Sequence, residues 1–208
     1  MHEAQAGALQ QPVGRRVARP EALTSEVAAL VVRTAAVIAA RWDPPGAVEK
    51  ILQFTTTQSE DVLTQLIEAW GRCADYESYA RTVLAEVNSR AFPVDLQSGP
   101  RIDHLNHLKS ITELRLRNHV IDLAPLTELP ELRYLELKNN DYVNLNKLVS
   151  CDTLRTLRLN QCSSVAGAMP IDLSPLLRLQ LDELIISGLL TKVDLSSLEG
   201  WDGMLTRE

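Results

Sequence analysis

The sequence predicts an α/β repeat protein, in which an N-terminal all-α helical bundle is followed by a short solenoid of stacked repeats with a parallel sheet. Three observations predict this architecture. A leucine pattern recurs four times after residue 105, a second short motif follows each copy, and the apolar residues between positions 21 and 90 have helical spacing instead. Self-similarity of this kind is the sequence signature of a solenoid.

The first motif has the form LxxLxLxx and predicts one short strand in each repeat. Its copies begin at Ile111, Leu132, Leu154 and Leu181, which places them 21, 22 and 27 residues apart. The two leucines of LxL point to one side of a strand, and the residue between them points to the other. One repeat cannot bury its leucines alone, but stacked neighbours can. The expected core consists of Leu114 and Leu116, Leu135 and Leu137, Leu157 and Leu159, and Leu184 and Ile186.

The second motif predicts the segment that returns the chain on the far side of the solenoid. Its four copies have an Asp or Asn followed by a leucine, two further residues and a second leucine: Asp122–Leu126, Asn144–Leu148, Asp172–Leu176 and Asp194–Leu198. The Asp or Asn can cap a short helical or 3₁₀ turn, and proline is favoured at the start of such a turn.

Together the two motifs give the segment from Leu105 to Leu198 a resemblance to leucine-rich-repeat proteins with short repeats of about 22 residues. The resemblance implies a parallel concave sheet and a ladder of asparagines that ties neighbouring loops together. The ladder position holds His119, Asn140, Cys162 and Leu189. Cysteine is a common substitute there, and Leu189 indicates that the ladder ends in a hydrophobic terminal repeat. His119 is interpreted as a turn residue, since no second ligand stands at metal-binding spacing.

The outward strand positions of the concave sheet are the predicted binding surface. They form a mixed basic and polar face with one aromatic side chain, and the candidate partner-binding residues are Arg115, Arg117, Tyr134, Glu136, Lys138, Arg158 and Asn160. Ile185 and Ser187 continue the columns, and a neighbouring column of Asn118, Asn139, Gln161 and Gly188 is almost a ladder of amides. Tyr and Arg are frequent at interface hot spots. The alternative is that alternating Arg and Glu only form cross-strand pairs.

A second candidate surface is the segment 163–170. It lengthens the third loop by about six residues relative to the others, and insertions in repeat proteins often map to a binding face. An ordinary surface loop is an equal alternative.

The N-terminal half is predicted to be helical. One helix begins at Thr24 or Ser25 and continues to about Arg41, and a short one occupies Ala47 to Phe54. A third begins near Ser59, and Asp75 caps a fourth that runs from Tyr76 to about Val87. The expected organisation is a flexible tail over residues 1–20, a helical domain over 21–100 and a repeat domain with a C-terminal cap over 101–208.

The segment Asp61–Val87 resembles a helical element of NACHT-type proteins of the STAND class from actinobacteria, which stands directly before leucine-rich repeats. In that class an ATP-hydrolysing domain lies further upstream, and the repeats sense a trigger or restrain the ATPase. No GxxxxGK[ST] loop occurs in this chain, so ATPase activity is not implied. The resemblance implies the sensor end of such an architecture, as a fragment or as a stand-alone relative.

Other classes of function find little support. The net charge of −6 argues against general nucleic-acid binding, and no catalytic or cofactor motif is present. His104 and His107 are interpreted as exposed residues at the start of an incomplete first repeat rather than as a metal site. The apolar run Val27–Ala40 is too short to span a membrane. Three cysteines without CxxC spacing predict buried or partly buried thiols in a reducing compartment, most simply the cytoplasm.

The sequence therefore predicts a non-enzymatic protein-protein interaction module, a sensor or regulatory scaffold, with a protein partner and without cofactor or metal. One alternative is an intramolecular, autoinhibitory segment of a larger NTPase. The other is an enzyme with a hidden site between the halves.

Overall fold

The computed structural model describes residues 51–52, 55, 60–70, 73, 75–87, 93–97, 102–118, 122–141, 143–163, 170–188 and 193–208. The predicted tail 1–20 and the helix expected up to Arg41 lie outside these residues, as do His119, Leu189 and most of the segment 163–170. Of the predicted helical bundle, the structure therefore describes only a part, which includes residues 60–70 and 75–87.

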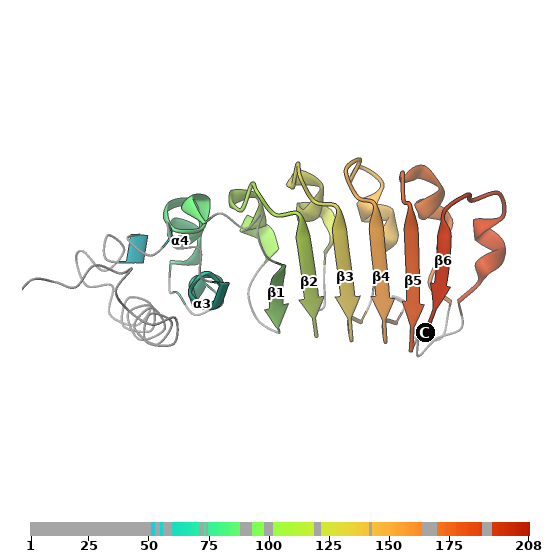
Figure 1. Ribbon diagram of the computed structural model, residues 1–208, viewed down its shortest axis with the longest axis horizontal. Helices are drawn as coiled ribbons and strands as arrows, with labels where there is room; N and C mark the ends of the chain where they lie inside the picture. Colours follow the sequence, from blue (N-terminus) through green and yellow to red (C-terminus); the bar gives the residue numbers. More distant parts are fainter. Residues whose placement is uncertain are drawn as a thin grey trace, which may run out of the picture.

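Six parallel strands form one sheet in chain order (Figure 1). The strands are β1 (Val94–Gln97), β2 (Glu113–Arg117), β3 (Tyr134–Lys138), β4 (Thr156–Asn160), β5 (Glu183–Ser187) and β6 (Met204–Arg207). The pairing aligns each LxL motif with the next, for example Leu114 with Leu135. Four strands were predicted and are confirmed, and the architecture is an α/β repeat solenoid.

Short 3₁₀ helices return the chain between the strands (Figure 1). They are η4 (Ile102–His107), η5 (Ala124–Glu128), η6 (Leu145–Leu148), η7 (Ser174–Arg178) and η8 (Leu195–Leu198). The predicted caps are confirmed, because Asn144 and Asp194 accept hydrogen bonds from the backbone N–H groups two residues later, at 3.1 and 2.9 Å. Pro125 and Pro175 are the second residues of η5 and η7.

The inward leucines form a continuous core with no exposure to solvent. Leu114, Leu116, Leu135, Leu137 and their counterparts in β4 have relative accessibilities of 0%. This burial follows from the register, because each LxL leucine lies against the equivalent side chain of the next repeat. At ~25 cal/mol per Å² of apolar surface removed from water, the burial of these leucines stabilises the stacked repeats.

The ladder between neighbouring loops is formed by two different side chains. The Nδ2 atom of Asn140 donates to the carbonyl oxygen of Leu116 at 2.8 Å, and the Cys162 thiol lies 3.2 Å from the carbonyl oxygen of Leu137. Both side chains are fully buried. Burial raises the pKa of the Cys162 thiol to about 11, so the thiol stays protonated and can donate. The prediction of buried thiols is confirmed for Cys151 and Cys162, and Cys73 is partly buried.

The first repeat contains a strand, β1, which corrects the expectation of an incomplete repeat that begins near residue 104. Val94 and Leu96 of β1 are 1% exposed and align with Leu114 and Leu116, and η4 then buries Leu105 fully. The sheet thus begins upstream of residue 101, where the repeat domain was expected to start. The signal was present as the short LxL-like run Val94-Asp-Leu96, with Ala91 instead of a large aliphatic residue at the first position of the full motif.

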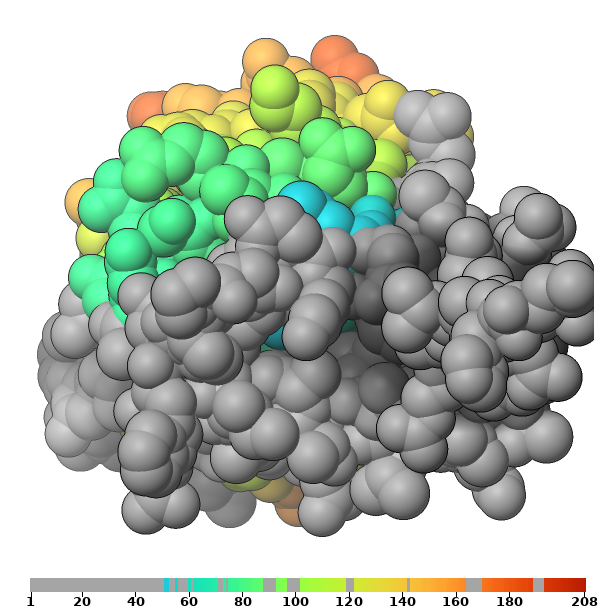
Figure 2. Space-filling view, turned by 90° about the vertical axis from the view of Figure 1, so that its left-hand side faces the viewer, coloured from blue at the N-terminus to red at the C-terminus, as the bar shows by residue number. Residues whose placement is uncertain are grey.

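Two α-helices adjoin the β1 end of the sheet (Figure 1). Helix α3 (Glu60–Trp70) contacts β1, and α4 (Tyr76–Thr82) contacts η4. Asp75 caps α4 as predicted, at 2.9 Å from the Ser78 N–H, but the α-helix ends at Thr82 and continues only as the 3₁₀ turn Leu84–Glu86. In Figure 2 the residues around α4, in green, lie in front of the repeats.

Two buried polar side chains tie these helices together. The Tyr79 hydroxyl donates to the Leu66 carbonyl at 2.9 Å, and the indole N–H of Trp70 donates to the Tyr76 carbonyl at 2.9 Å. Because Trp70 and Leu66 are almost fully buried in the same core as Leu96, the helices cover the end of the leucine stack.

Candidate outer-face binding site

The outer face of the sheet is the face opposite the leucine core, and its strand positions form columns across the repeats. The central column consists of Asp95, Arg115, Glu136, Arg158, Ile185 and Thr206. These side chains are only partly exposed, because each neighbouring strand places another side chain about 5 Å away. Opposite charges alternate over the strands β1 to β4.

A chain of ion pairs runs along this column. The Glu136 carboxylate lies 3.6 Å from the Nε atom of Arg115 and 3.7 Å from that of Arg158, and its side chain is only 13% exposed. Arg158 also contacts Glu208 at 2.5 Å through its Nη2 atom. The contacts of Glu136 are longer than a hydrogen bond, so its attraction to both arginines is electrostatic. Cross-strand ion pairing was the alternative interpretation of this face. It accounts for the presence of Arg115, Glu136 and Arg158 in the column.

The next column towards the strand ends contains the remaining charged candidates. Arg117 pairs with Asp95 at 2.6 Å, which the sequence analysis did not anticipate because β1 was not predicted. Lys138 and Asn160 align with Arg117. Lys138 makes no ion pair with any residue in the described part of the chain.

Tyr134 lies two residues before Glu136 in β3, on the same side of the strand. The pKa of its hydroxyl is raised, first by burial and then by the Glu136 carboxylate, while Arg158 and Arg115 oppose the shift. The hydroxyl is therefore close to the same three charged groups that occupy the centre of the face. Four of the seven predicted residues, namely Arg115, Tyr134, Glu136 and Arg158, are brought together in one cluster.

The column of Asn118, Asn139, Gln161 and Gly188 is explained by a shared backbone conformation and not by a ladder of amide side chains. Asn118, Asn139 and Gln161 have φ values of 57°, 52° and 53°, and Gly188 has 52°. This left-handed conformation favours Asn and Gly because other side chains meet the backbone there. The four residues mark the turn after each strand, and their recurrence needs no ligand as an explanation.

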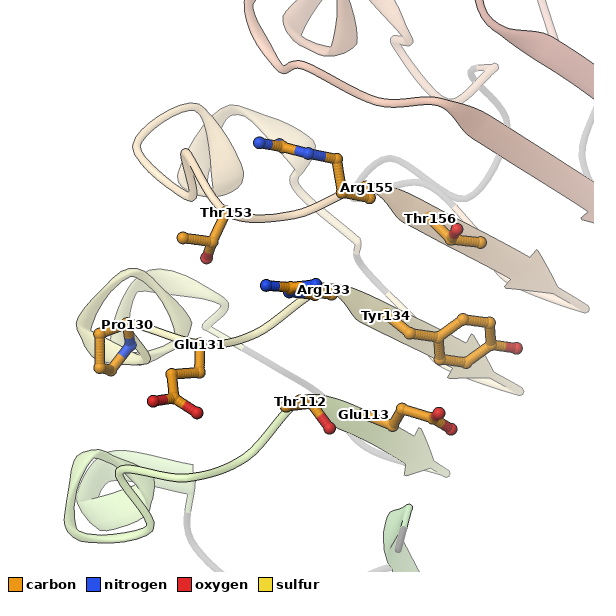
Figure 3. Close-up of a pocket in the computed structure, with 9 residues that line it drawn as sticks. All are labelled: Thr112, Glu113, Pro130, Glu131, Arg133, Tyr134, Thr153, Arg155 and Thr156. Atoms are coloured by element: carbon orange, nitrogen blue, oxygen red, sulfur yellow. The ribbon is translucent and has the colours of Figure 1, made fainter. Parts of the chain in front are cut away.

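A pocket of about 760 Å³ opens at the beginning of strands β2, β3 and β4 (Figure 3). It is lined by Thr112, Glu113, Pro130, Glu131, Arg133, Tyr134, Thr153, Arg155 and Thr156. In Figure 3 the Tyr134 ring extends along its strand on one side, while Arg133 and Arg155 extend towards the preceding turns. Arg155 is held by the carbonyl oxygens of Asp152, Leu154 and Gln180. Arg133 is exposed and has no ion pair within the described residues.

The backbone explains why adjacent residues line the same pocket. The carbonyl oxygen of Thr112 accepts the N–H groups of both Arg133 and Tyr134, and that of Arg133 accepts those of Arg155 and Thr156. Two residues of one strand thus face one residue of its neighbour, as in a β-bulge. At this bulge-like start of β3, successive side chains do not alternate between the two faces of the sheet. Arg133 and Tyr134 therefore both line the pocket.

The two histidines of η4 lie beside each other and next to an aromatic ring. His104 and His107 are partly exposed rather than fully exposed, their rings stack at 6.2 Å, and His104 lies 5.4 Å from Tyr76. The pKa of His107 is lowered, first by burial and then by the nearby His104. Within the described residues no three His, Cys, Asp or Glu side chains come together as a metal site. In the same residues no helix is long and apolar enough to cross a membrane.

Comparisons with known proteins add little to this geometry. No protein-family model matches the chain, and no curated protein matches it. Among solved structures, the chain is similar to internalin C2 of Listeria monocytogenes, with 22% identity and a TM-score of 0.41. The aligned part covers 61% of this chain and 55% of internalin C2, less than two thirds of that protein. At this identity and TM-score the likeness carries no argument, and the repeat fold rests on the strand pairing described above.

Proposed function

We propose that the chain is a non-enzymatic protein-interaction module, and that its outer face binds a segment of a partner protein at the pocket beside Tyr134. The observation that carries the proposal is this pocket, which extends over three successive repeats next to the charged cluster. Its surface combines an aromatic ring, several hydroxyl groups and an exposed guanidinium that has no ion pair with the residues that the structure describes. Tyr and Arg are enriched among the residues that dominate interface energies.

The mixture of charges favours a protein over a nucleic acid as partner. Acidic and basic side chains alternate on the outer face, and Glu113 and Glu131 line the same pocket as Arg133. A surface that follows phosphates needs clustered positive charge. A protein segment can instead present acidic, basic and apolar groups in turn, which suits this pattern.

The finer proposal is a cytoplasmic sensor or regulatory scaffold similar to the repeat end of a NACHT-type signalling protein. It rests on the sequence resemblance of Asp61–Val87 to the helical element that precedes the repeats in that class. A helical domain over residues 21–100 and a repeat domain over 101–208 belong to the same proposal. An autoinhibitory role within a larger NTPase remains the alternative.

The test compares capture of partner proteins by the wild-type chain and by a double variant, Arg133→Glu and Tyr134→Thr. Threonine is the residue that β4 has at the equivalent position, Thr156, so the strand should persist. Reversing Arg115 and Arg158 would be a poorer test, because both flank the nearly buried Glu136 carboxylate. The matched control reverses two exposed basic residues of the 3₁₀ helices, Lys147→Glu and Arg178→Glu.

Proteins captured from a lysate of the source organism are quantified by mass spectrometry for the three baits. The proposal expects at least one protein that the wild type and the control retain and the double variant loses. If the double variant retains every captured protein, the pocket is not the binding surface, and the segment 163–170 or the helical half becomes the candidate. If no bait captures a protein, the intramolecular alternative is favoured.

A further inference from the structure

Arg158 forms ion pairs with two carboxylates on the outer face. Its Nη2 atom lies 2.5 Å from the Glu208 carboxylate, and its Nε atom lies 3.7 Å from Glu136. Tyr134, which lines the pocket, has its hydroxyl within the electrostatic influence of the same guanidinium. The Arg158 side chain remains 27% exposed, so a binding partner can reach it.

The two carboxylates on Arg158 are held very differently. Glu136 belongs to the adjacent strand, is 13% exposed and is shared with Arg115. Glu208 follows β6 and reaches Arg158 across the whole width of β5, where the intervening residue of the column is Ile185. Its side chain is 48% exposed. Glu136 is thus part of the sheet surface, whereas Glu208 is an exposed group that can leave.

The backbone near Glu208 also permits such a movement. The Glu208 N–H donates to the Ile186 carbonyl at 3.0 Å, at the end of the strand pairing between β5 and β6. Strand β6 is the last strand of the sheet, and its residues Met204 and Leu205 are 58% and 38% exposed. A segment at the edge of a sheet with few buried contacts opens more readily than the centre.

From this arrangement we infer that Arg158 is the binding position for an acidic side chain of a partner segment, and that Glu208 occupies it in the free chain as an internal competitor. The inference rests on the proposed function and specifies the chemistry of the partner. Arg158 lies two residues after Thr156, which lines the pocket, on the same side of β4, so a segment in the pocket can continue to the guanidinium. A guanidinium binds a carboxylate through two parallel hydrogen bonds, so Asp or Glu is the fitting residue.

Competition between Glu208 and the partner predicts that the two substitutions change the affinity in opposite directions. Removing the charge of Arg158 removes the site, whereas removing the charge of Glu208 frees it. Because an exposed ion pair is only weakly stabilising, Glu208→Gln should raise the affinity by about two- to fivefold. Arg158→Gln should lower it by about tenfold or more, since a charge-assisted contact at the centre of an interface is lost.

The experiment uses a displayed library of random twelve-residue peptides, selected on the full wild-type chain. The affinity of the most enriched peptide is then measured for the wild type, Arg158→Gln, Glu208→Gln and a control. Arg207→Gln is the matched control, because Arg207 neighbours Glu208 but aligns with the inward residue Ile186. A second peptide has its acidic residue replaced by the corresponding amide, and circular dichroism verifies that each variant is folded.

The expected result is an acidic peptide that binds more tightly to Glu208→Gln, at least tenfold more weakly to Arg158→Gln and unchanged to Arg207→Gln. The amide peptide should bind weakly to all four proteins and should not distinguish Glu208→Gln from the wild type. Enriched peptides without an acidic residue, or an affinity that Glu208→Gln leaves unchanged or lowers, would overturn the inference.

The same selection separates failure of this inference from failure of the proposed function. If a peptide is sensitive to Arg133→Glu and Tyr134→Thr but not to Arg158→Gln, the pocket binds a segment and only the assignment of Arg158 is wrong. If the peptide is insensitive to all of these substitutions, or if no peptide is enriched, the outer face is not the binding surface and both proposals fail.

Discussion

The inner and outer sides of strands β2 to β4 differ in how much their residues vary. Towards the core, both LxL positions hold leucine in all three strands, and each of these side chains is fully buried. Towards the outside, the three columns hold Glu, Tyr and Thr, then Arg, Glu and Arg, and then Arg, Lys and Asn. The comparison teaches that the stacking of repeats restricts only the inner side, while the outer side is free to acquire a binding surface.

The largest effect should follow a change on the inner side. Leu137→Ala removes a fully buried side chain from the centre of the stack, where neighbouring leucines leave little room to relax. We expect it to lower the free energy of unfolding by about 2–5 kcal/mol. Urea denaturation measures this loss, with Lys138→Ala as the control on the outer side. Equal losses for the two variants would contradict the division into an inner and an outer side.

The ladder residue Asn140 should give the next largest effect. Asn140→Ala removes the buried hydrogen bond from the side chain to the Leu116 carbonyl, and such a bond contributes about 0.5–1.5 kcal/mol. Asn140→Cys should cost less, because Cys162 makes the same contact to Leu137 in the following repeat. If the Ala and Cys variants unfold at the same urea concentration, the thiol is not an effective ladder donor.

The inward side chains are less buried at β6, because nothing in the described residues stacks against this last strand. Leu205 occupies the same column as Leu184 but is 38% exposed, compared with 0% for Leu184. Leu205→Ala should therefore cost less than about half of what Leu184→Ala costs, since the removed area is already partly hydrated. Thermal unfolding of both variants tests this ratio. A Leu205→Ala loss as large as that of Leu184→Ala would mean that position in the column, and not burial, sets the effect.

The smallest effects on stability are expected on the outer side. Glu136→Gln removes the charge between Arg115 and Arg158 but keeps the shape of the side chain. Partly exposed ion pairs contribute roughly 0–1 kcal/mol, so we expect a loss in this range that shrinks as salt is added. Urea unfolding at low and high ionic strength measures it. A loss of several kcal/mol that salt does not change would show that the ion pairs belong to the fold rather than to the surface.

The sequence predicted the repeats well because their cause is local. The LxL motif fixes which side chains face inward, and an Asp or Asn that accepts a hydrogen bond from the N–H two residues later fixes where a 3₁₀ helix begins. Strand β6 was missed for a physical reason. Its inner positions are Leu205 and Arg207, and an exposed end strand does not require a second leucine.

The candidate site was only partly predictable, since it depends on contacts between distant residues. Glu208 meets Arg158 from fifty positions away in the chain, a contact that no local spacing indicates. The pocket was missed because simple alternation places Arg133 and Tyr134 on opposite sides, whereas the shared Thr112 carbonyl brings them together. The residues Asn118 and Asn139 were misread, because a preference for a left-handed backbone resembles a preference for an amide side chain.

The most direct test of the account measures binding and stability on the same preparations of wild type and Tyr134→Thr. The captured partner is titrated calorimetrically into each protein, and urea unfolding gives the stability. Because Tyr134 is on the outer side, the account predicts a change in unfolding free energy of less than about 1 kcal/mol. It also predicts an affinity lowered by about tenfold or more. An unchanged affinity, or an affinity that falls only together with a large loss of stability, would contradict the claim that the outer side carries the function.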